Sequence, residues 1–276
     1  MQTAFATARA EPVGRLIRHW RQHRRWSQLD LACEAEISAR HLSFLETGRA
    51  QPSRDMLLRL AEQLDVPLRE RNVLLVSAGY APTFRERALD DPELAQARVA
   101  IDWLLHAQAP NPALAVDRHW NLVTANAPAQ HLLAGIDAAL LAPQVNVLRV
   151  SLHPGGLAPR IVNFVEWRTH LLHRLRRQVE ASGDGGLAAL LVELEALPLP
   201  AGVTALPAAS HGGLPLSGVV VPLQLHTPLG TLSFLSTTMV FGTAVDITLA
   251  ELVVESLFPA DAATAQALVR LAATAA

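Results

Sequence analysis

Two short helices separated by only four residues constrain the fold most strongly. Apolar residues at helical spacing predict the helices at 28–34 and 39–46. Ser27 and Ser38 are suitable N-caps for them, and Gly48 suits the residue just after the second helix. Because so few residues lie between the helices, the chain must turn sharply and pack one helix against the other.

Three more helices are predicted around this pair. One covers about 13–24, a second starts after Ser53, and a third runs from Pro67 to near Gly79. Their apolar positions recur at helical spacing, so each has one face for a shared core. The sequence therefore predicts an all-α N-terminal domain of five helices over residues 10–80.

The helix at 39–46 turns Leu42 and Leu45 inward and leaves its other face open. A helix of this width fits the DNA major groove, where each base pair presents a distinct pattern of donors and acceptors. We expect Arg40 to read guanine, Phe44 to meet a thymine methyl group and Gln28 to bond a phosphate. The candidate DNA-contacting residues are Gln28, Ser38, Ala39, Arg40, His41, Ser43, Phe44, Arg49 and Arg54.

The run SQLDLACEAEISARHLSFLETGRAQPSRDMLLRLAEQLDVP resembles the helix-turn-helix of the Xre family, the Cro/C1 type of phage repressors. The spacing of the helices and the Leu-Glu-x-Gly that ends the second one coincide over about 60 residues. The resemblance implies binding to double-stranded DNA and an ion pair between Arg21 and Glu46. A helical protein-docking module remains an alternative, because short capped helix pairs also serve that purpose.

The charge distribution agrees with a DNA partner for the front of the chain. Residues 1–80 carry 12 arginines and 9 acidic residues, a net charge of +3, whereas 81–276 carry 11 and 16, a net charge of −5. The single Cys33 excludes an internal disulfide, and we expect it to be a small buried residue. With no apolar run of 18 residues and no secretory signal pattern, we expect a cytoplasmic, nucleoid-associated protein without a membrane span.

A charged linker at 81–92 leads to a second domain over 93–276, in which helical and β patterns are mixed. The predicted elements are a helix at 92–107, a strand pair at 114–125, a helix at 161–180, two strands across 218–242, and helices at 247–257 and from about 261. This order indicates an α+β domain with an antiparallel sheet. Asp246 is placed to cap the helix that follows it.

Three stretches of this domain, LAVDRHWNLVTANAPA, GLAPRIVNFVEW and VVVPLQLHTPLGTLSFLSTTMVFGTAVDITLAELVVESLFPAD, are similar to the ligand-binding domain of MmyB-like regulators. The resemblance implies a PAS-like fold with an apolar cavity for a small, fatty-acid-like effector, and no other cofactor. The large rings that could line it are Trp103, Trp120, Phe164, Trp167, Phe234 and Phe241. Arg118, Arg160 and Arg168 are candidates to meet a ligand carboxylate.

Catalytic and metal-binding motifs are weak. His170 and His173 are three residues apart on a predicted helix, but no third ligand lies near them in sequence. The run SHGG at 210–213 has no Gly-x-Ser-x-Gly elbow to accompany it. We therefore predict no enzyme and no metal site, with an enzyme that carries a DNA-binding domain as the second alternative.

The combined prediction is a transcriptional regulator whose operator binding is modulated by a small apolar ligand. We expect a homodimer, because two reading helices on half-sites about 34 Å apart match a palindromic operator.

Overall fold

The computed structural model describes residues 11–200, 220–242 and 244–275, which form two compact units. Unit 1 contains residues 11–88 together with 244–250, and unit 2 contains the rest of the described chain. Unit 1 is helical, and unit 2 combines helices with a sheet. Residues 244–250 thus belong to unit 1, although they lie between two stretches of unit 2 along the chain.

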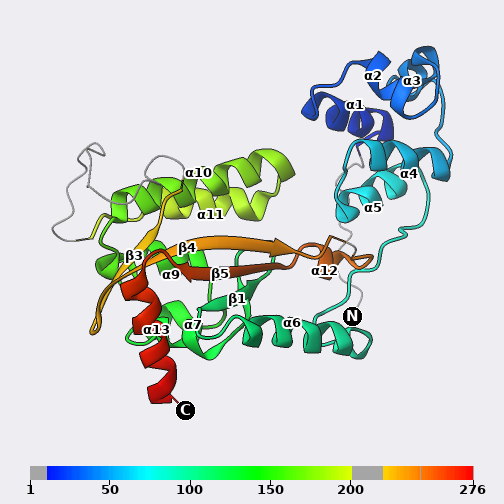
Figure 1. Ribbon diagram of the computed structural model, residues 1–276. Helices are drawn as coiled ribbons and strands as arrows, with labels where there is room; N and C mark the ends of the chain where they lie inside the picture. The colour runs from blue at the N-terminus through cyan, green and yellow to red at the C-terminus, as the bar shows by residue number, and fades with distance from the viewer. Residues whose placement is uncertain (1–10, 201–219, 243, 276) are drawn as a thin grey trace. The chain divides into compact units, whose positions relative to one another are not determined.

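The helices of unit 1 follow the predicted pattern closely (Figure 1). They are α1 (Val13–His23), α2 (Gln28–Glu34), α3 (Ala39–Glu46), α4 (Arg54–Gln63) and α5 (Leu68–Ser77). Ser27 Oγ accepts a hydrogen bond from the Asp30 amide at 3.1 Å, and the Asp30 carboxylate accepts one from the Ser27 amide at 2.8 Å. Ser38 Oγ likewise accepts from the His41 amide, so both N-caps form as predicted.

A close crossing of α1 and α3 compacts this unit. The two helices meet at Gly14, where a Cβ atom would lie 2.3 Å from the carbonyl oxygen of Leu45. Only glycine allows this approach without moving backbone. Cys33, expected to be buried, is instead exposed, because Leu31 and Ala32 occupy the face of α2 that meets the core.

Residues 244–250 complete unit 1 from far along the sequence. This segment contains α12 (Ile247–Ala250) and is held by an ion pair between Arg87 Nη1 and Asp246 Oδ2 at 2.8 Å. The Asp246 side chain is almost fully buried, and Thr248 Oγ1 donates a hydrogen bond to the Arg87 carbonyl. Asp246 also caps α12 as predicted, since its Oδ1 accepts from the Thr248 amide at 3.0 Å.

The described part of unit 2 contains a five-stranded antiparallel sheet in the order β2-β1-β5-β4-β3 (Figure 1). The strands are β1 (Ala113–Val116), β2 (Leu122–Ala125), β3 (Leu223–Thr227), β4 (Gly230–Val240) and β5 (Val253–Pro259). The predicted turn between β3 and β4 forms at 227–230, with Gly230 at a φ of +104°. Alternating residues of each strand face opposite sides of the sheet.

The helix predicted at 247–257 is wrong beyond its first turn. The helix α12 ends at Ala250, and residues from Val253 onward form β5 in the centre of the sheet. Val254 lies opposite Met239 on one side and Ala115 on the other. Pairing on both edges satisfies the backbone of this short apolar run, which outweighs its helical spacing.

The helices of unit 2 cover both faces of the sheet. They are η1 (Pro92–Leu94), α6 (Ala95–Ala107), α7 (Ala127–Leu132), α8 (Ala138–Leu141), α9 (Val147–Leu152), η2 (Ala158–Arg160), α10 (Phe164–Ser182), α11 (Gly185–Ala196) and α13 (Ala262–Ala275). Figure 1 shows α10 and α11 on one face of the sheet and α6 and α7 on the other. No helix within the described ranges is long and apolar enough to cross a membrane.

Candidate functional site

Glu46, the last residue of α3, fixes this helix to its two neighbours. Its carboxylate accepts hydrogen bonds from Arg21 Nε at 2.6 Å, Arg21 Nη2 at 3.0 Å and Gln28 Nε2 at 2.8 Å. The Arg21 and Glu46 side chains are only 9% and 2% exposed. The ion pair implied by the family resemblance is therefore confirmed, and it joins α1, α2 and α3 at one buried point.

The opposite face of α3 is open. Arg40 is exposed, and Ser43 and Phe44 are half-buried beside it. The guanidinium carbons of Arg40 and Arg49 lie 5.4 and 5.9 Å from the centre of the Phe44 ring. Phe44, predicted to meet a thymine methyl group, thus also contacts two arginines by cation–π interaction, worth about 0.5–1 kcal/mol each at an exposed site.

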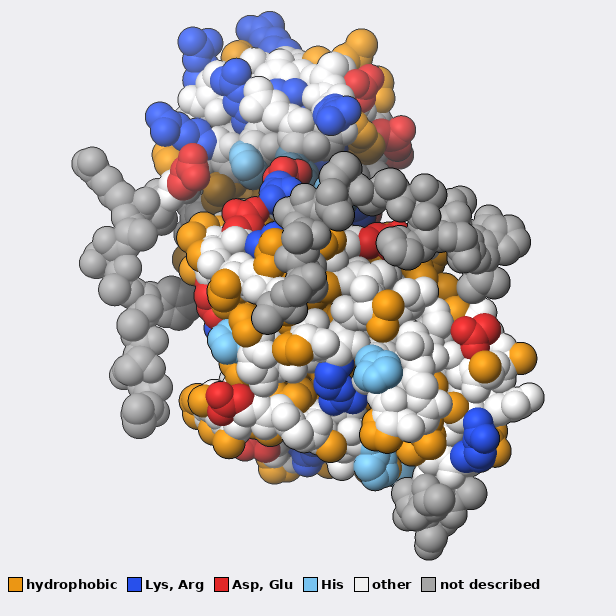
Figure 2. Space-filling view, turned by 90° about the vertical axis from the view of Figure 1, so that its left-hand side faces the viewer, with side chains coloured by type: hydrophobic (Ala, Val, Ile, Leu, Met, Phe, Trp, Pro, Cys, Tyr) orange, Lys and Arg blue, Asp and Glu red, His pale blue; other side chains and the backbone are white. Residues whose placement is uncertain are grey.

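Other predicted DNA-contacting residues have partners inside unit 1. Ser38 caps α3, Gln28 bonds Glu46, and Arg54 Nη2 donates to Thr83 Oγ1 at 2.8 Å. Each of these three side chains keeps at least one further donor, so its contact with DNA stays a prediction. The DNA contacts of Ala39 and His41, which are half-buried on α3, also stay predictions. Arginine side chains crowd the surface of unit 1 (Figure 2), as its excess of basic residues requires.

Four of the six rings predicted to line a ligand site lie together in unit 2. Trp120, Phe164, Trp167 and Phe234 are buried in one hydrophobic core that α10 and α11 form with the sheet. Phe241 follows β4, is half-buried and lies outside this core. The structure thus brings most of the predicted rings into one apolar layer.

Trp103 does not belong to that layer. Its side chain is 74% exposed on α6, whereas Ile101 and Leu105 of the same helix are buried. Trp103 is two residues from both Ile101 and Leu105, and at that helical spacing its side chain is directed away from the buried face. The prediction that Trp103 lines a ligand cavity with the other rings is therefore not supported by its position.

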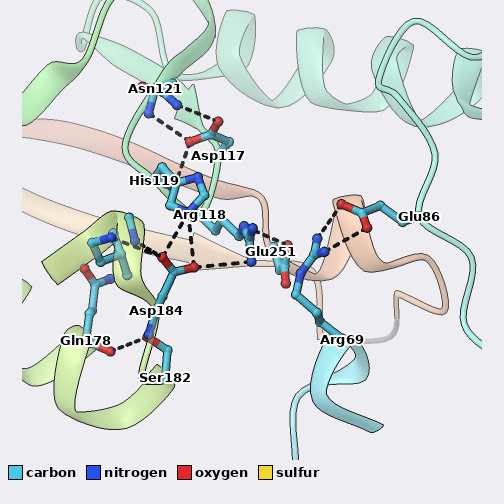
Figure 3. Close-up of polar contacts among 12 residues, drawn as sticks. Arg69, Glu86, Asp117, Arg118, His119, Asn121, Gln178, Ser182, Asp184 and Glu251 are labelled. Carbon is cyan, nitrogen blue, oxygen red and sulfur yellow. Dashed lines mark hydrogen bonds and ion pairs between the residues drawn. The ribbon is translucent and has the colours of Figure 1, made fainter. Parts of the chain in front are cut away.

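The three arginines predicted to meet a ligand carboxylate are bonded within the protein. Arg118 Nη1 lies 3.3 Å from Asp184 Oδ2 (Figure 3). Arg160 donates to the carbonyls of residues 132 and 134, and Arg168 donates to those of residues 194 and 195. These contacts tie helices and loops of unit 2 together.

Sequence reasoning missed Arg174 of α10. Its Nη2 donates to Glu255 Oε1 at 2.6 Å and to Thr238 Oγ1 at 3.0 Å, and its guanidinium carbon lies 4.5 Å from the centre of the Trp120 ring. Glu255 also accepts from the hydroxyls of Ser236 and Thr238. A charged pair is thus placed beside the apolar layer that contains the predicted rings.

The turn between β1 and β2 holds Trp120 in an unusual conformation. Its φ is +66°, a region that costs a bulky residue about 1–3 kcal/mol. Asp117 stabilises the turn, because its carboxylate accepts from the amides of His119 and Asn121 and from the Asn121 side chain (Figure 3). The surrounding hydrogen bonds therefore fix where the Trp120 ring points.

Asp184 links this turn to the start of α11. It accepts from the amides of Gly186 and Leu187, and His119 Nε2 lies 3.1 Å from its Oδ2 (Figure 3). Burial opposes ionisation of this carboxyl, but the hydrogen bonds from Leu187, His119 and Gly186 outweigh it and lower the pKa of Asp184. An ionised Asp184 thus stabilises the frame around Trp120 at neutral pH.

Metal ligands are not grouped in the described ranges, where no three His, Cys, Asp or Glu side chains could hold an ion together. His170 instead stacks on Trp167, with ring centres 5.6 Å apart. The SHGG run at 210–213 lies outside the described residues.

Comparison with known proteins gives two matches to families. The family described as MmyB-like transcription regulator ligand binding domain matches residues 97–271, and the family described as helix-turn-helix domain matches residues 12–74. Similar relatives include uncharacterized HTH-type transcriptional regulators of Mycobacterium bovis and Mycobacterium tuberculosis, 33% identical over 116 residues. The alignment covers 40% of this chain and 39% of each relative, so it spans about two fifths of their length.

The Arg21–Glu46 pair yields a stability prediction. Arg21→Met leaves the Glu46 carboxylate buried without a cation, so we expect the free energy of unfolding of unit 1 to fall by about 3–5 kcal/mol. Chemical denaturation of the full chain measures this change. Arg176→Met, which removes an exposed ion pair with Glu195, is the matched control and should cost less than about 1 kcal/mol. Equal losses in the two variants would show that the buried pair is not the anchor of unit 1.

Proposed function

Since this chain belongs to the family of the MmyB-like transcription regulator ligand binding domain, with a helix-turn-helix domain ahead of it, we propose that it regulates transcription by binding double-stranded DNA. Binding of a small apolar, fatty-acid-like ligand to unit 2 alters its affinity for the operator. The observation that carries the proposal is α3, anchored through Glu46 and open along the Arg40 face. The proposed location is the cytoplasm, on the nucleoid.

Recognition of bases depends on the rigidity of α3. The buried ion pair fixes one face of the helix, and the Phe44 ring orients Arg40 and Arg49 on the other. A pre-oriented guanidinium loses less entropy when it forms a bidentate contact with guanine O6 and N7. Arg40 is therefore the residue proposed to select bases, and Arg49 the one proposed to bond phosphate.

The proposed regulator is a homodimer. Two copies of α3 about 34 Å apart would contact successive major grooves on one side of the duplex. Unit 2 has an exposed apolar surface on α6, formed by Val99, Trp103 and Leu104. Pairing of this surface with its own copy would cover the exposed tryptophan, since a two-fold interface uses the same residues on both subunits.

Coupling between ligand and operator is proposed to pass through residues 244–250. This segment belongs to unit 1, where Asp246 pairs with Arg87, yet it connects β4 directly to β5. Of those strands, β4 supplies Phe234 to the hydrophobic core of unit 2, and β5 supplies Glu255, which bonds Arg174 of α10. A ligand that shifts either strand would therefore displace residues 244–250, which belong to the DNA-binding unit. Ligand binding and DNA binding would then favour the same or opposite positions of this segment, and such a preference couples the two affinities.

DNA selection tests the regulatory function. From a pool of random duplexes, the natural chain should enrich a two-fold symmetric motif. Arg40→Ala should weaken the preferred site by roughly 5- to 150-fold and relax one base position in each half-site, because a bidentate contact discriminates by about 1–3 kcal/mol. Gln28→Ala should weaken all sequences alike.

Arg176→Ala, a change to an exposed arginine of unit 2, is the control and should leave the motif unchanged. Failure to enrich any motif at moderate salt, with Arg40→Ala altering the binding of another protein, would instead favour the docking-module alternative.

Light scattering tests the dimer surface. We expect Trp103→Asp to convert a dimer into a monomer at micromolar concentration, because a carboxylate would be buried at the centre of the proposed interface. Val192→Asp, on the exposed side of α11, is the matched control and should stay dimeric. A dimeric Trp103→Asp variant would place the interface elsewhere.

Asp246→Asn tests the coupling route. Asparagine can still cap α12, but the charge pair with Arg87 is lost. Dodecanoate should then bind with a Kd within about twofold of the natural value, while its effect on operator affinity shrinks by several-fold. Calorimetry and fluorescence anisotropy measure the two quantities. Glu193→Gln, which breaks a pair inside unit 2, is the control, and an undiminished response in Asp246→Asn contradicts the route.

A further inference from the structure

We infer that Arg174 binds the carboxylate end of the fatty-acid-like ligand proposed for unit 2. The inference rests on the proposed ligand-dependent function and adds the polar half of the binding site. It draws on three observations. Arg174 forms an ion pair in an apolar setting, several of its N–H donors are unused, and its guanidinium contacts the ring of Trp120, a residue with a strained backbone.

The ion pair is difficult to explain by stability alone. The Arg174 and Glu255 side chains are 25% and 10% exposed, beside a layer otherwise built from aliphatic and aromatic residues. Desolvation of two charges offsets most of their attraction, and apolar residues of similar volume are often at least as stable. A charge pair retained at such a position is therefore a candidate for recognition.

Most of the guanidinium is unused. Arginine has five N–H donors, and the bonds to Glu255 and Thr238 both come from Nη2. In the part of the chain that the structure describes, Nε and Nη1 of Arg174 have no hydrogen-bond partner, which leaves three donors. The partial exposure of the side chain allows an anion to reach them, and a carboxylate offers the matching acceptors.

Trp120 orients this guanidinium. Its ring lies under the Arg174 guanidinium, and its Nε1 donates to Gln178 Oε1 at 2.8 Å, one turn further along α10. Trp120 has a positive φ, a strained conformation for a bulky residue, in the place where its ring contacts Arg174. Strain of this kind is concentrated at sites that bind ligands, where it pre-organises the contact.

The surroundings of Arg174 favour an anion and an apolar chain together. Burial lowers the pKa of His170 most, and the nearby Arg174 and His173 lower it further, while Glu255 raises it. Leu171 lies one turn before Arg174 on the same helix and belongs to the buried core. A carboxylate bonded to Arg174 would thus direct its apolar body toward the layer that contains the predicted rings.

The test compares two probes that differ only at the polar end, dodecanoate and dodecan-1-ol, by calorimetry on the full chain. The natural protein should bind dodecanoate at least about tenfold more tightly, as expected for hydrogen bonds to a charged group. Glu255→Gln should raise the affinity for dodecanoate several-fold, because the competing carboxylate is removed while an acceptor for Ser236 and Thr238 remains. Arg174→Met combined with Glu255→Gln leaves no unpaired charge, and this double variant should bind both probes equally.

Each outcome bears on the inference. An unchanged preference for dodecanoate in the double variant overturns the role of Arg174, while the proposed function stands if dodecanoate still alters operator affinity. Equal binding of both probes by the natural protein also overturns it. If neither probe binds the natural protein, the proposed ligand class fails and the inference falls with it. Thermal unfolding of the double variant, which we expect within a few degrees of the natural chain, shows that a loss of preference comes from the site.

Discussion

The buried carboxylate of Glu46 is the point on which unit 1 depends. Arg21 of α1 and Gln28 of α2 both donate to it, so three helices share one charged centre. An unpaired charge buried this deeply would cost several kcal/mol of folding free energy, about 3–5 kcal/mol. The positions of α1, α2 and α3 relative to one another therefore depend on the same bonds. The open face of α3 makes none of these bonds, which leaves Arg40 and Ser43 free to differ without loss of the scaffold.

Much of unit 1 could be predicted from the sequence because local signals determine it. Ser27, Ser38 and Ser53 cap helices at the predicted places, and each has an amide partner within three residues along the chain. The strand β5 could not be predicted in this way. Val253, Val254 and Leu257 fit either a helix or a strand, and only pairing with β1 and β4 decides between them.

The helix predicted in place of β5 also concealed the Arg174–Glu255 pair of unit 2. In a helix Glu255 would be one charge among several, but in a strand it lies on the same face as Val253 and Leu257, which pack against the core. Its inward position, and hence its pair with Arg174, becomes visible only when the strand is recognised. For Trp103 the difficulty was different: both sides of α6 carry apolar residues, so periodicity alone does not show which side meets the sheet.

The path of the chain limits how the protein can be divided. A fragment that stops at residue 92 would contain α1 to α5 but would lack the helical turn α12 and the partner of Arg87. The complementary fragment would carry α12 with a buried aspartate that has lost its counter-ion. Neither truncation corresponds to a complete folding unit, so the two halves are best produced as one polypeptide even when only one of them is under investigation.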